Sequence, residues 1–285
     1  MKKNAFLISL SLLTFNFGCF KSNEGLSTFQ VTTETDICYT GDIGYLQLNE
    51  GEMHNQLVSL MIDNWSICST DADEIANEIK RIINNKGYDI AEDQNLDFNE
   101  FKAIVNSLDL SSLLYTLNAA NFNFEEAIDG QSFSLLLKAK MKGLVDLMEE
   151  MNYNKEVSII QSDICNYYNQ EKTGLNQDDL IYFGIMTDIL IHSTGLWLAS
   201  ELGGQNKYIE FQSVLNNICG GAVQERGFWS KIILADAFGA IASAGSSLIS
   251  SGGATALPNP LLGGIPTAGV IAVVGGASAS ISKAM

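Results

Sequence analysis

Near the C-terminus, residues 228–250 read FWSKIILADAFGAIASAGSSLIS and residues 265–285 read IPTAGVIAVVGGASASISKAM. A small residue recurs at every fourth position of each segment, so these side chains share one stripe of a helix. The two stripes contain Ala235, Gly239, Ser243 and Ser247, and then Ala268, Ala272, Gly276 and Ser280. Paired glycines and prolines between the segments interrupt a helix. The pattern predicts two closely packed helices folded back as a hairpin, a geometry that membranes favour.

The charge pattern of this tail leaves three alternatives open. Residues 228–285 contain only three charged side chains, Lys231, Asp236 and Lys283. A charge inside a membrane span marks a functional group or a water-facing side, and the apolar part of the second segment is at the lower limit of a span. We expect a hairpin that enters lipid. The alternatives are a hairpin packed on the rest of the chain and a disordered tail.

The N-terminus has the parts of an export signal. Lys2 and Lys3 precede a short apolar run, and Gly18 and Cys19 follow it, which is the order found in secretory signals. The pair Gly18-Cys19 resembles the lipobox of bacterial lipoproteins, in which the cysteine is lipidated after cleavage, although Asn16 stands where that family prefers Leu. We therefore expect residues 1–19 to be a signal peptide and Cys19 to carry lipid. The protein would then be anchored in the cell envelope outside the cytoplasm, on the periplasmic or surface side.

The remaining chain divides by composition. Residues 20–48 are rich in Thr, Ser and Gly and are expected to form a flexible leader. Residues 49–227 show apolar positions at helical spacing, with no proline before Pro258. They predict an acidic all-α domain of six to eight helices, one of them capped by Thr70. The expected fold is thus an all-α, acidic multi-helix bundle followed by the Gly/Ala-rich helical hairpin of residues 228–285.

The charge distribution limits which partners are expected, and the cysteines permit disulfides. The net charge is −17, and the ends contribute +2 (residues 1–19) and +1 (residues 228–285), so residues 20–227 hold −20. Such a body disfavours nucleic acid as a partner, because phosphate binding depends on Lys and Arg. Membrane lipid is the expected partner, together with a second copy or another membrane protein through the tail. Besides Cys19, the four cysteines at positions 38, 68, 165 and 219 permit disulfides in three pairings.

Residues 89–100 resemble an incomplete EF-hand calcium loop. Asp89, Asp93, Asp97 and Glu100 fall at ligand positions of such a loop. Position 3 is Ala91, however, and position 6, which should be Gly, is Gln94. The competing interpretation is an acidic loop in which Asp97 and Glu100 cap the next helix. No cofactor is expected, with calcium as a weak alternative.

The histidines give little sign of catalysis. His54 lies near a helix start, where a lone histidine is usually a structural residue, although Glu50 and Glu52 could join it in a metal site. His192 and Asp188 are four positions apart on one expected helix and can pair, with Ser193 next to them. The chain has no G-x-S-x-G elbow and no nucleotide-binding fingerprint, so we expect no enzyme. A hydrolase around His192 is the least favoured hypothesis.

Two stretches carry a resemblance to a protein group. Gly51, His54 and Asn55 form a Gly-x-x-His-Asn element, and residues 228–240 place an aromatic, a basic residue and Ala-Asp before a Gly/Ala-rich run. Both features resemble uncharacterised exported proteins and lipoproteins of Bacteroidota-type bacteria, and the tail is similar to glycine-zipper segments of small bacteriocins. The resemblance implies location and architecture only. The expected function is a cell-envelope lipoprotein that interacts with membranes through its hairpin, with bacteriocin-like toxicity as one outcome. The alternative is an exported soluble binding module with a degenerate calcium loop.

Overall fold

The computed structural model describes residues 49–220, 229–250 and 267–285, without the side chains of residues 244–250, 267 and 268. The described residues are all-helical and contain no strand, which confirms the all-α fold class. The helices are α2 (Glu50–Asn64), α3 (Ala72–Lys86), α4 (Tyr88–Asp93), α5 (Phe98–Ser107), α6 (Leu110–Asn118), α7 (Phe124–Asp129), α8 (Leu135–Glu150), α9 (Val157–Glu171), α10 (Gln177–Trp197), α11 (Lys207–Cys219), α12 (Trp229–Ser250) and α13 (Thr267–Ala284), with one 3-10 turn at Ser200–Leu202.

Most of these helices begin at a side chain that caps them. The Asp71 carboxylate accepts from the backbone N–H groups of Asp73 and Glu74 and starts α3, so the cap is Asp71 and not the predicted Thr70. Asn, Asp or Ser side chains start α2, α5, α6, α7, α8 and α10 in the same way. Such a cap satisfies N–H groups that the first helical turn leaves unpaired.

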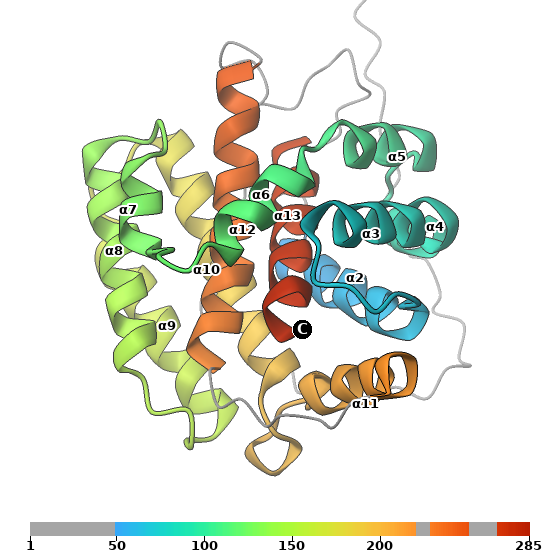
Figure 1. Cartoon of the computed structure of the whole chain (residues 1–285). Helices are drawn as coiled ribbons and strands as arrows, with labels where there is room; N and C mark the ends of the chain where they lie inside the picture. The colour runs from blue at the N-terminus through green and yellow to red at the C-terminus, as the bar shows by residue number, and fades with distance from the viewer. Residues whose placement is uncertain (1–48, 221–228, 251–266) are drawn as a thin grey trace, which may run out of the picture. The chain divides into compact units, whose positions relative to one another are not determined.

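The two C-terminal helices lie among the others. Helices α12 and α13 make the most extensive contact with each other; α12 also packs on α10, and α13 packs on α2 and α6. Figure 1 shows α12 and α13 side by side, with α7–α9 on one side and α2–α5 on the other. All the described helices belong to one compact unit by contacts, so the hairpin helices are packed within the helical body.

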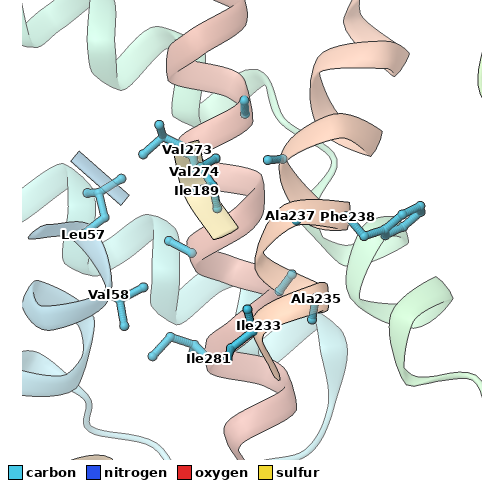
Figure 2. Close-up of a cluster of buried hydrophobic side chains, with 14 of the residues drawn as sticks. Leu57, Val58, Ile189, Ile233, Ala235, Ala237, Phe238, Val273, Val274 and Ile281 are labelled. Atoms are coloured by element: carbon cyan, nitrogen blue, oxygen red, sulfur yellow. The ribbon is translucent and has the colours of Figure 1, made fainter. Parts of the chain in front are cut away.

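The hydrophobic core surrounds this hairpin. Figure 2 shows Leu57 and Val58 of α2 and Ile189 of α10 around side chains of α12 and α13, all of them buried. In α13, nearly every described side chain from Val270 to Ile281 is buried. A helix that is apolar and buried all round belongs to the centre of a protein or to a membrane.

A disulfide between Cys68 and Cys219 joins the α2–α3 connection to the end of α11 across 151 positions. Cys165 is disulfide-bonded too. The sequence left the pairing open, and the structure places Cys68 with Cys219. The expected signal peptide, Cys19 and the leader of residues 20–48 lie outside the described residues.

Candidate functional site

Asp236 of α12 forms the centre of a buried polar cluster. Its side chain is fully buried, and its Oδ1 lies 3.2 Å from Nε2 of His54, which is fully buried on α2. Its Oδ2 accepts a hydrogen bond from the Ser193 hydroxyl and another, at 2.9 Å, from the Trp197 indole N–H; both donors belong to α10. Three helices therefore meet at one carboxylate.

Asn55 determines how His54 presents its ring. The Asn55 side-chain NH₂ donates to the backbone carbonyl of His192 at 3.0 Å, so the Asn55 carbonyl oxygen faces Nδ1 of His54, also at 3.0 Å. Nδ1 must then carry a proton, while Nε2 faces the Asp236 carboxylate. The His54 ring therefore lies between the Asn55 side chain and the Asp236 carboxylate and brings α2 against α12.

A second group of polar side chains joins α2 to α10 beside the first. The Asp188 carboxylate accepts a 2.6 Å hydrogen bond from the backbone N–H of Gly51, and its other oxygen lies 3.3 Å from Nδ1 of His192. A Cβ at position 51 would overlap the His192 ring and lie 2.7 Å from the Asp188 carbonyl oxygen. Glycine at position 51 therefore allows the two helices to come this close.

Two side chains of this second group have shifted pKa values. Burial, and then repulsion from Asp188, raises the pKa of the Glu50 carboxyl to about 8, so it is largely protonated at neutral pH. Burial lowers the pKa of the His192 imidazole, but the hydrogen bonds and attraction of Asp188 together outweigh that effect and hold it above its usual value. The raised pKa values of Glu50 and His192 both favour the protonated form at the contact between α2 and α10.

The arrangement differs from that of a Ser-His-Asp triad. In a Ser-His-Asp hydrolase the histidine lies between the serine and the carboxylate and takes the serine proton. Here the Ser193 hydroxyl donates directly to Asp236, and Ser193, His54 and Asp236 are all fully buried. His192 pairs with Asp188, as the sequence spacing suggested for a helix pair. The cluster therefore connects α2, α10 and α12.

The four predicted calcium ligands are not gathered around one point. Asp89 and Asp93 lie on α4, where the first part of the expected loop is helical. Asp97 caps α5 by accepting from the N–H groups of Asn99 and Glu100. Among the residues that the structure describes, no group of three or more His, Cys, Asp or Glu side chains is placed to hold a metal ion. The missing glycine at position 94 and the strong cap of Asp97 explain the difference.

Small residues of both predicted stripes lie at the contact between α12 and α13. A Cβ at Gly239 would overlap the carbonyl of Gly275 and lie 2.6 Å from the Ala279 Cβ, and a Cβ at Gly275 would overlap Ser243. Gly276 also approaches α12, because a Cβ there would lie 2.6 Å from the backbone carbonyl oxygen of Asp236. Ala235, Ala272 and Ser280 are fully buried. The side chains of Ser247 and Ala268 lie outside the described residues.

Part of this cluster was visible in the sequence. Asp236 was noticed as a charge in an apolar helix, and His54 as a lone histidine, but their pairing was not predicted. A buried carboxylate needs partners, but the sequence offers many donors and does not single out His54. The role of Trp197 was missed, because nothing local distinguishes a buried indole with a partner from any other core tryptophan.

Comparisons with known proteins add no relative. No protein-family model, curated protein or solved structure matches the chain. In the part of the chain that the structure describes, α10 is the one helix long and apolar enough to cross a membrane, and it is mostly buried, as core helices are; residues 269–284 form a shorter apolar helix.

Proposed function

We propose that the protein is a membrane-anchored protein of the cell envelope, exported from the cytoplasm, whose C-terminal hairpin is stored in the helical body and interacts with lipid when it leaves that body. The proposed anchor is lipid on Cys19. The proposed partner is the bilayer itself, and the proposal is non-enzymatic. Entry of the hairpin into a foreign membrane would cause leakage, which is the form a bacteriocin-like activity would take.

The observation that carries the proposal is the way α12 and α13 contact each other. Gly239, Gly275 and Ser243 bring the two helix backbones into direct contact, and this contact is more extensive than any the hairpin makes with the body. Close packing of small residues holds helices together in lipid as well as in protein. The hairpin can therefore keep its own contact when its surroundings change from core side chains to acyl chains.

Two further features support the location. The chain contains a disulfide between Cys68 and Cys219, and Cys165 is also disulfide-bonded. Disulfides form and persist in oxidising compartments outside the cytoplasm. The acidic body keeps such a chain soluble but gives it little attraction to anionic lipid. Apolar contact through the hairpin would therefore have to provide the membrane affinity of the unlipidated protein.

Hydrogen exchange on liposomes tests the proposal. The mature chain with Cys19→Ser, which has no lipid anchor, is mixed with zwitterionic liposomes, floated and analysed by exchange and mass spectrometry. We expect part of the protein to float and dye to leak. In the bound fraction α12 and α13 should stay protected, while α2 and α10, whose partner has left, should exchange faster.

The control is Leu135→Ser, which removes the most exposed large apolar side chain of the described surface. It should leave flotation unchanged. No flotation of the parent chain would overturn the proposal and favour the soluble binding module, in which the hairpin is a permanent core. Flotation without faster exchange of α2 and α10, or flotation lost in Leu135→Ser, would mean that the outer surface binds lipid, and would also overturn it.

A further inference from the structure

The only acidic residue of the hairpin has all its described partners in the body. Asp236 is the sole Asp or Glu in residues 228–285. Its two oxygens contact His54 of α2 and Ser193 and Trp197 of α10. The polar side chains of α13 do not contribute to this group: Ser278 and Ser280 bond to carbonyls of their own helix. The hairpin thus depends on the body for every described partner of its carboxylate.

The other contacts between the hairpin and the body differ in kind. Around Asp236 they are mostly apolar, made by residues such as Ile233 and Phe238, and acyl chains can replace them. Further polar contacts lie at the C-terminal end of α13, where Asn118 donates to Ser282, Gln212 to the Ala284 carbonyl and Lys283 to the Leu117 carbonyl. Groups at a helix end can reach the polar surface of a bilayer, but Asp236, seven residues beyond Trp229, lies deeper.

We infer that the contact of Asp236 with His54, Ser193 and Trp197 is a latch that retains the hairpin in the body and sets how readily it moves into lipid; this inference rests on the proposed function. A charged Asp is disfavoured in the bilayer core. Withdrawing it also takes away the carboxylate oxygen to which the buried Ser193 hydroxyl and Trp197 indole donate, which is costly in a protein interior. Both effects act in the same direction and favour the stored hairpin.

The latch predicts that variants with an equal loss of stability differ in how much lipid they need in order to float. Asp236→Asn removes the carboxylate that faces His54, and with it the charge that the hairpin would carry into lipid. His54→Gln removes the ring from this contact but leaves the Asp236 carboxylate on the hairpin. Asp188→Asn is the matched control, because Asp188 is a buried carboxylate that joins α2 to α10 and lies outside the hairpin.

The measurement is the lipid concentration for half-maximal flotation of the full mature chain with Cys19→Ser, together with the midpoint of urea unfolding without lipid. We expect Asp236→Asn to need at least tenfold less lipid than the parent. His54→Gln should need less lipid than the parent but more than Asp236→Asn, because it weakens the contact yet leaves the Asp236 carboxylate on the hairpin. Asp188→Asn should change this concentration less than threefold, even where its unfolding midpoint falls as far as that of Asp236→Asn.

Three outcomes would decide the matter. Lipid affinity that simply follows the unfolding midpoint in all three variants would overturn the latch while the proposed function stands. Failure of the parent and of every variant to float would overturn both. If Asp236→Asn does not fold, His54→Gln decides: the latch requires faster hydrogen exchange of α12 and α13 than of α8 and α9 in that variant without lipid, and uniform exchange would contradict it.

Discussion

Glu50 shows at the scale of one residue how the contact between α2 and α10 responds to pH. Its carboxyl is buried in the first turn of α2 beside Asp188, so ionisation would place two negative charges together away from water. The raised pKa of Glu50, about 8, lies above the usual value of 4.5. Between these two pH values the folded chain binds more protons than the unfolded chain, and its free energy of unfolding falls as the pH rises.

We predict that Glu50→Gln removes most of this pH dependence. The amide cannot ionise, so at pH 9 the variant should be more stable than the parent by on the order of 4 kcal/mol, whereas below pH 4.5 the two should agree. A smaller slope should remain, because the raised pKa of His192 acts in the same direction. Urea unfolding across pH 4–9 measures it. Glu74→Gln, at an exposed first-turn position of α3, is the control, and parallel curves for the parent and Glu50→Gln would contradict the prediction.

Gly51 makes a second residue-scale prediction. Gly51→Ala places a methyl group against the His192 ring and the Asp188 backbone, and because backbone cannot give way easily we expect a loss of about 2–3 kcal/mol in unfolding free energy. The matched control is Gly195→Ala on α10, where the new methyl would lie 3.4 Å from the Gln161 side chain and the better helix propensity of Ala should make the change neutral or stabilising. Equal effects in thermal unfolding would show that the close approach at Gly51 is unimportant.

At the scale of elements, the sequence predicted what depends on local chemistry. The fold class and the two hairpin helices followed from periodicity and breakers. The body has ten α-helices in residues 49–220, where six to eight were predicted, because short helices such as α4 and α7 have no periodic pattern to reveal them. Helix α11 ends at Cys219, because Gly220 adopts a left-handed conformation. The pairing of His54 with Asp236 joins distant helices, and no local pattern could show it.

The start of helix α5 allows a test of whether Asp97 acts as a helix cap or as a calcium ligand. Asp97→Ala removes the side chain that accepts from the N–H groups of Asn99 and Glu100 and should cost about 1 kcal/mol of unfolding free energy. Asp89→Ala, on exposed α4 surface, should cost almost nothing. Neither effect should depend on millimolar calcium in urea unfolding. A calcium-dependent stabilisation of the parent that both variants lose would instead establish Asp89–Glu100 as a calcium loop.

At the scale of the whole molecule, the hairpin and the body depend on each other. Leu57 and Val58 of α2 and Ile189 of α10 are fully buried around α12 and α13. Uncovering a large aliphatic side chain costs about 1.5–3 kcal/mol, and a domain has only about 5–15 kcal/mol of net stability. Departure of the hairpin therefore implies a loosened body. For the body to stay rigid after the hairpin moves into lipid, its core would have to be buried without contacts from α12 and α13.

We therefore predict that a chain ending at residue 227 does not fold cooperatively by itself. It should keep much of its helical far-ultraviolet signal, lose near-ultraviolet signal and bind a hydrophobic dye, as expected of a compact state without fixed packing. The chain of residues 35–285, which keeps the whole contact unit, should unfold in one sharp transition and serves as the control. A sharp transition in the chain ending at residue 227 would show two independent domains. It would also mean that the hairpin can leave without loosening α2 and α10, so the faster exchange expected of those helices on liposomes would lose its physical basis.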